Sequence, residues 1–164
     1  FGDNVNIIKI SGAYYNGHDA GVNGSEAYRN AFRDELKACA NPENYPMIFH
    51  CAIGRDRTGT LSFILQALCG VEKDALIREY ELSYLSVGGT LDGNKQMVNT
   101  ITNFYDFVNT YEGETFADKA ASLVKSLGVT DEDVASIKKI FNCCFLSCPH
   151  AFALVYGRGA CKNR

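Results

Sequence analysis

Two short stretches in the first third of the chain have the pattern of β-strands, and a helical pattern lies between them. Residues 4–10 alternate and become apolar on both sides at the end, as a strand covered by helices requires. The run 47–49 is wholly apolar and forms the second predicted strand. Between them, Ser25 begins a helix that Asn41-Pro42 ends, with a buried stripe of Tyr28, Ala31, Phe32, Leu36 and Cys39. Strand, helix and strand in this order predict a parallel pair with a right-handed crossover.

The remainder of the chain has helical periodicity. Gly70 and Gly128 are placed to end helices, and Thr130 with Asp133 predicts a capping box for the last one. The stripes expected to pack in the core are Leu61, Ile64, Leu65 and Leu68; Leu76, Ile77, Tyr80 and Tyr84; Met97, Val98, Ile101, Tyr105 and Val108; Phe116, Ala120, Leu123, Val124 and Leu127; and Val134, Ile137 and Ile140. The sequence therefore predicts an α/β fold in which helices flank a parallel sheet and the C-terminal half is helical.

Composition narrows the class of protein. The 164 residues are 46% hydrophobic, enough for one domain with its own core, and 21% are charged, which argues against disorder. The net charge of −3, without any basic tract, argues against nucleic-acid or membrane-surface binding. No apolar run approaches the roughly 18 residues of a membrane span.

The most informative stretch is residues 49–59, which read Phe-His-Cys-Ala-Ile-Gly-Arg-Asp-Arg-Thr-Gly. It places Cys51 at the end of the second predicted strand, in a loop that leads into a helix N-terminus. Backbone amides in such a loop bind a dianion, and Arg57 can add two parallel N–H bonds to phosphate oxygens. The positive charge of Arg57 and of the amide dipoles also favours the thiolate, because the pKa of a free cysteine, about 8.5, falls to roughly 3.5–7.5 in sites of this kind. We therefore expect Cys51 to be a nucleophile aimed at phosphorus.

The pattern His50-Cys51, five residues, Arg57-Thr58 resembles the signature loop of the cysteine-dependent protein tyrosine phosphatases. HCAIGRDRTG is most similar to the bacterial and fungal branch that also includes phosphoinositide phosphatases, although Arg55 stands where that branch usually carries lysine. The resemblance covers roughly residues 5–141, including 74–84 and 127–133. It implies a phosphatase-like domain at residues 1–141, followed by a cysteine-containing tail at 142–164. It also implies further strands before Phe1, so that the domain would be incomplete at its N-terminus.

The resemblance implies hydrolysis of phosphate monoesters through a phosphocysteine intermediate, without a metal or other cofactor. The substrate would be a phosphotyrosine protein or a phosphoinositide, and neither the choice nor the oligomeric state follows from the sequence. Cys51 would attack, Arg57 would hold the phosphate and His50 would support the loop. The remaining loop residues would bind the substrate: Ala52, Ile53, Gly54, Arg55, Asp56 and Thr58.

The resemblance does not assign the general acid to a single residue. In the family it is usually an aspartate about thirty residues before the cysteine. Asp19 lies 51 − 19 = 32 residues upstream, in a glycine-rich loop that follows the first predicted strand. The carboxyl ends of parallel strands share one edge of a sheet, so this loop should lie beside the signature loop. Asp56 is the competing candidate, and a residue outside the chain is the third alternative.

Two other classes of function compete with the phosphatase. One is a catalytically impaired phosphate-binding module; the other is a sulfur-transfer or arsenate-reducing enzyme, which the loop length and the position of Cys69 disfavour. Four of the seven cysteines, Cys143, Cys144, Cys148 and Cys161, lie in the last 22 residues. They could bind zinc with His150 or form a disulfide, but their spacing matches no compact metal site. A reactive Cys51 favours the reducing cytoplasm, although secretion stays open.

Overall fold

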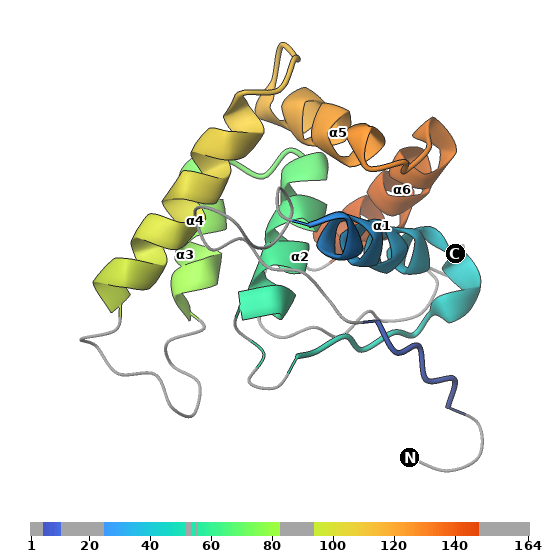
Figure 1. The fold of residues 1–164 in the computed structure, drawn as a ribbon. Helices are drawn as coiled ribbons and strands as arrows, with labels where there is room; N and C mark the ends of the chain where they lie inside the picture. The colour runs from blue at the N-terminus through green and yellow to red at the C-terminus, as the bar shows by residue number, and fades with distance from the viewer. Residues whose placement is uncertain (1–4, 11–24, 52–53, 55, 83–93, 148–164) are drawn as a thin grey trace.

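The computed structural model describes residues 5–10, 25–51, 54, 56–82 and 94–147, with the side chains of 94–100 and 143–147 left aside. Helices account for most of this part of the chain (Figure 1). Their bounds are α1 Glu26–Ala40, the short 3₁₀ helix η1 Pro42–Asn44, α2 Asp56–Leu68, α3 Lys73–Leu82, α4 Asn94–Asn109, α5 Phe116–Ser126 and α6 Asp131–Ser147. None of the described helices is long and apolar enough to cross a membrane.

Helix α2 lies at the centre and packs against α1, α3, α5 and α6 (Figure 1). It is buried on almost every side, which is typical of a helix that is apolar all round. The ring of Phe63 lies 5.3 Å from Phe104 of α4 and 6.2 Å from Phe116 of α5, centroid to centroid. Burying this helix holds its N-terminal turn, which follows the signature loop, against the rest of the fold.

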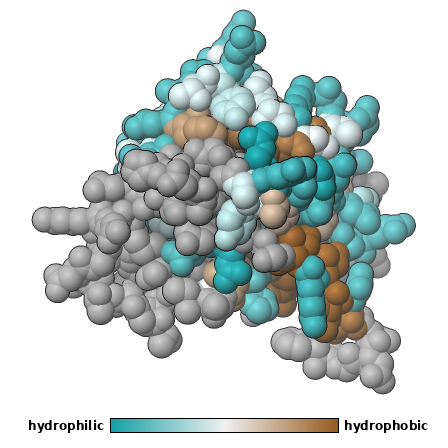
Figure 2. Space-filling view, in the orientation of Figure 1, coloured by the Kyte–Doolittle hydropathy of each residue, from teal (hydrophilic) through white to brown (hydrophobic). Residues whose placement is uncertain are grey.

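The predicted parallel sheet is wrong for the part of the chain that the structure describes. Residues 5–10 and 45–51, which carry the two predicted strands, form no strand there. Several of their apolar side chains are instead exposed, namely Val5, Ile7, Ile8 and Ile48. Figure 2 shows hydrophobic surface gathered in the region where Figure 1 draws residues 5–10. Two strands alone make a marginal sheet, so a strand-like pattern of apolar residues is not sufficient to produce a ladder.

The helical predictions fared better than the strands. The stripe residues Phe32, Leu36 and Cys39 of α1 are buried, as are all four predicted residues of α2, although Tyr28 is 38% exposed. Ser25 stands at the start of α1 but makes no side-chain capping bond. Tyr84 lies outside the described residues, as do the side chains of Met97 and Val98.

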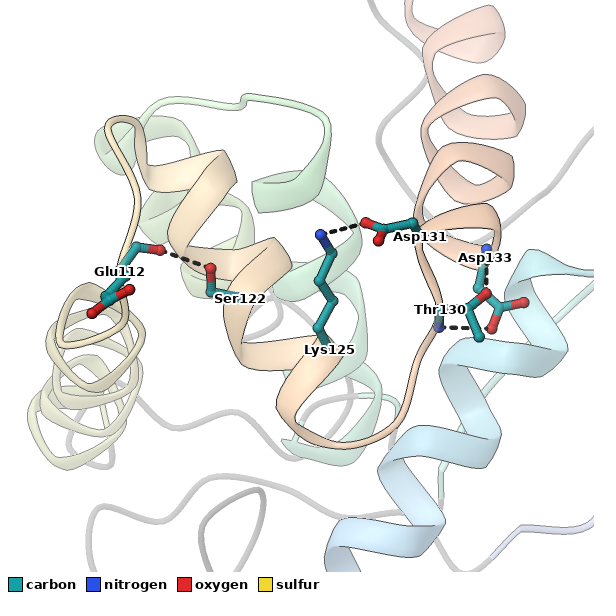
Figure 3. Close-up of polar contacts among 6 residues, drawn as sticks. All are labelled: Glu112, Ser122, Lys125, Thr130, Asp131 and Asp133. Carbon is teal, nitrogen blue, oxygen red and sulfur yellow. Dashed lines mark hydrogen bonds and ion pairs between the residues drawn. The ribbon is translucent and has the colours of Figure 1, made fainter.

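The turn between α5 and α6 is held by short polar contacts (Figure 3). The Thr130 N–H donates to Asp133 Oδ2 at 3.1 Å and the Asp133 N–H donates to Thr130 Oγ1 at 3.2 Å, which confirms the predicted capping box. Lys125 of α5 pairs with Asp131 of α6. Gly128 ends α5 with a φ of 97°, a conformation that favours glycine. These contacts fix α6 at the angle at which it covers α1 and α2.

Candidate active site

The N-terminal turn of α2 and the segment before it bring Cys51 and Thr58 together. Cys51 is partly buried, and its N–H donates to Thr58 Oγ1 at 2.8 Å. Thr58 is itself buried, with 7% of its surface exposed. The hydrogen bond spans seven residues and closes the loop that joins them. Thr58 thus contacts the backbone of the cysteine, whereas the family resemblance implied a contact with the substrate.

Helix α2 begins earlier than the periodicity indicated. Its first residue is Asp56, so Arg57 and Thr58 lie in its first turn rather than before it. The first amides of a helix have no partner within it and carry the positive end of the helix dipole. The first turn of α2 therefore combines the positive end of the helix dipole with the Arg57 side chain, six residues after Cys51. The arrangement has the polarity that an anion requires.

A cavity of about 900 Å³ opens at this point of the described chain. Cys51, Arg57 and Thr58 line it, together with Glu35 and Cys39 of α1 and residues of the segments 5–10 and 43–50. Its walls are largely apolar away from these groups, because Val5, Ile7, Ile8, Met47, Ile48 and Phe49 contribute to them. The cavity is large enough for a phosphate ester and not only for an inorganic anion.

The segment before Cys51 is anchored to the C-terminal end of α1. Asn44 Nδ2 donates to the Ala38 carbonyl at 2.9 Å, and the Tyr45 hydroxyl donates to the Cys39 carbonyl at 2.8 Å. Both bonds satisfy carbonyls that a helix end leaves without a partner. They fix the chain that leads to Cys51 against α1, and so keep the cysteine near the side chains of that helix.

His50 and Gly54 show how the loop itself is shaped. His50 Nδ1 lies 2.9 Å from the Cys51 carbonyl oxygen, so the tautomer protonated at Nδ1 donates to it. Gly54 has a φ of 72°, and a Cβ added there would meet nothing within 4 Å. Glycine is thus required by the backbone conformation and not by lack of space. That His50 supports the loop stays a prediction.

Several predicted site residues fall outside the described residues: Asp19, Ala52, Ile53 and Arg55. Cys148, Cys161 and His150 also lie outside the described residues. Cys143 and Cys144 lie in α6, but their side chains are not described. Asp56 is described, as the first residue of α2, where its negative charge faces the positive end of the helix dipole.

Glu35 is a member of the cavity that the sequence did not reveal. Burial raises the pKa of its carboxyl to about 7, the Arg57 guanidinium opposes this rise, and the Cys51 thiol adds to it. Burial, and secondly the Glu35 charge, raise the pKa of the neighbouring Cys39 thiol to about 12, so Cys39 is not a nucleophile at neutral pH. The sequence signal that could have identified Glu35 is its position, because it stands next to the buried stripe of α1.

Comparison with known families identifies the chain. The profile of the tyrosine phosphatase family matches residues 13–141, which is most of the chain and includes the signature loop. The protein therefore belongs to the tyrosine phosphatase family, as its loop resemblance indicated. Comparison with curated proteins and with solved structures gives no match.

Proposed function

We propose that this member of the tyrosine phosphatase family hydrolyses phosphate monoesters through Cys51. The observation that carries the proposal is the hydrogen bond from the Cys51 N–H to Thr58, which joins the cysteine to the first turn of α2 at a cavity that Arg57 also lines. A thiolate, a guanidinium and the backbone amides of a helix N-terminus at one cavity wall are what phosphoryl transfer to sulfur needs.

The proposed reaction has two steps. The Cys51 thiolate forms a bond to phosphorus while the ester P–O bond breaks, and the general acid gives its proton to the leaving oxygen. Water then attacks the phosphocysteine, the conjugate base takes a proton from that water, and the S–P bond breaks to release inorganic phosphate. Arg57 and the amides hold the equatorial oxygens throughout.

We propose Asp19 as the general acid, with Asp56 as the alternative. The substrate is proposed to be a phosphotyrosine protein, and Arg55 gives a reason to test phosphoinositides beside it, since it adds positive charge to the loop. A thiolate nucleophile requires a reducing milieu, which favours the cytoplasm as the compartment. We propose no metal, because the guanidinium and the amides supply the positive field.

The test compares the chain with its Cys51→Ser variant on p-nitrophenyl phosphate, whose good leaving group needs little help from an acid. The unaltered protein should turn over, with a phosphorylated Cys51 trapped by acid quench and located by mass spectrometry. The serine variant should bind inorganic phosphate without turnover. Turnover by the serine variant would contradict covalent catalysis at this residue. Binding without turnover by the unaltered protein would favour the phosphate-binding module.

A further inference from the structure

Glu35 brings a carboxyl to the wall of the proposed phosphate site. Helix α1 holds it between the fully buried Phe32 and Leu36, so its backbone has little freedom to withdraw. Its Oε2 atom is shielded from solvent and has no hydrogen-bond partner in the described part of the protein. A buried polar atom without a partner costs about 1–3 kcal/mol, so each such atom in a folded protein calls for an explanation, and a bound ligand is one.

The charges that act on this carboxyl belong to the proposed catalytic groups. Arg57 attracts its ionised form, and the Cys51 thiolate repels it. The other titratable groups lining the cavity are Cys39 of α1, Glu43 of η1, and Tyr45 and His50 of the following segment. Helix α1 also packs against α6, from which the Ser136 hydroxyl donates to the Ala40 carbonyl. Arg57 is thus the cation that both Glu35 and a bound phosphate would share.

We propose that Glu35 is a further residue of the anion site, which binds its phosphate dianion with the Glu35 carboxyl protonated and Oε2 donating a hydrogen bond to a phosphate oxygen. The inference rests on the proposed function, because it takes the cavity at Cys51 as the phosphate site. The protonated carboxyl removes the charge that would repel the dianion and gives the buried Oε2 a partner. An ionised Glu35 would instead neutralise Arg57.

The proposal couples anion binding to one proton. When Glu35 is ionised in the empty site, binding of the dianion is accompanied by uptake of one proton, which protonates the Glu35 carboxyl in the complex. Because the carboxyl has a pKa of about 7, it is mostly neutral below that pH and mostly ionised above it. Affinity should therefore be flat in acid and fall about tenfold for each pH unit in alkali.

The experiment uses sulfate, which stays divalent across the neutral range and so adds no titration of its own. Calorimetry in buffers of different ionisation enthalpy gives affinity and proton uptake together, at about pH 6 and about pH 8. The parent is Cys51→Ser, which removes the thiol titration. It is compared with the same chain carrying Glu35→Gln, whose amide keeps the shape and a donor. Glu43→Gln is the matched control, since Glu43 is an exposed carboxylate lining the same cavity.

We expect the parent to take up close to one proton per sulfate at the higher pH and to bind roughly tenfold more weakly there. Glu35→Gln should abolish both effects and bind at both pH values as the parent does in acid, while Glu43→Gln should behave as the parent. Persistence of uptake and slope in Glu35→Gln, or their absence from the parent, would overturn the proposal.

The two proposals can fail separately. Proton-linked sulfate binding by a chain that does not turn over p-nitrophenyl phosphate would leave Glu35 in an anion site and remove catalysis. Turnover together with pH-independent sulfate binding would leave catalysis and remove the role of Glu35. If sulfate binds at neither pH, the anion site is overturned and this inference with it.

Discussion

The backbone N–H of Cys51 donates to the side-chain oxygen of Thr58 at 2.8 Å. A residue of the first turn of α2 is thereby bonded to the proposed nucleophile at the other end of the loop. The bond replaces water at a partly buried amide, and the loop keeps its curvature as long as α2 stays in place. Movement of α2 would therefore be transmitted directly to the cysteine.

Thr58→Ala should destabilise the protein and slow turnover. It leaves the Cys51 N–H without its acceptor, which typically costs about 1–3 kcal/mol in the free energy of unfolding. Urea denaturation and the rate on p-nitrophenyl phosphate measure the two effects. Thr58→Ser retains the acceptor and is the control, expected to lie much closer to the unaltered protein. Equal losses in the alanine and serine variants would show that the methyl group, and not the hydrogen bond, matters.

Gly59 should not tolerate a side chain. A Cβ at this position of α2 would lie 2.6 Å from Cε2 and 2.8 Å from Cδ2 of Tyr80, a buried residue of α3. We expect Gly59→Ala to lower the free energy of unfolding by about 1–3 kcal/mol, although alanine is the better helix former. In a double-mutant cycle, Gly59→Ala should cost less in a chain that already carries Tyr80→Leu than in the unaltered protein, because the clashing ring is absent. Strictly additive effects would contradict the contact.

The assignment of the general acid can be tested with two isosteric variants. Asp19→Asn should lower turnover of a phosphotyrosine peptide by about 10²–10⁴-fold and affect p-nitrophenyl phosphate much less, because nitrophenolate leaves without a proton. Asp56→Asn should have a smaller effect on the peptide. A collapse for Asp56→Asn with an unchanged rate for Asp19→Asn would transfer the role to Asp56.

Glu35 should make stability depend on pH. Its folded-state pKa of about 7 lies above its ordinary value of 4.5, so between these values the folded chain binds more protons than the unfolded chain. The contribution of Glu35 to the free energy of unfolding is fully present below pH 4.5. It is lost as pH rises through about 7, and the loss is at most about 3 kcal/mol. Urea denaturation over this range should show the unaltered protein losing stability relative to Glu35→Gln, which does not titrate. Parallel curves for the two proteins would contradict the burial of the carboxyl.

The amino-acid sequence by itself determined the family and most of the helices, and it predicts the chemistry of the signature loop. These features are local: a helix bonds residues four apart, so a stripe such as Phe32, Leu36 and Cys39 marks its buried face. The signature loop is a contiguous run whose residue types are needed at fixed spacing. Thr130 and Asp133 likewise could be identified as a capping box because each bonds to the other's backbone within one turn.

The tertiary structure decided what depends on distant partners. Residues 5–10 alternate as a strand does, but a ladder needs a neighbouring strand with which to share hydrogen bonds, and alternation does not provide one. The pKa of Glu35 likewise depends on burial, which raises it, and on two residues far away in sequence: Arg57, which lowers it, and Cys51, which raises it. Periodicity shows which face of a helix is buried, and only packing shows which charges meet there.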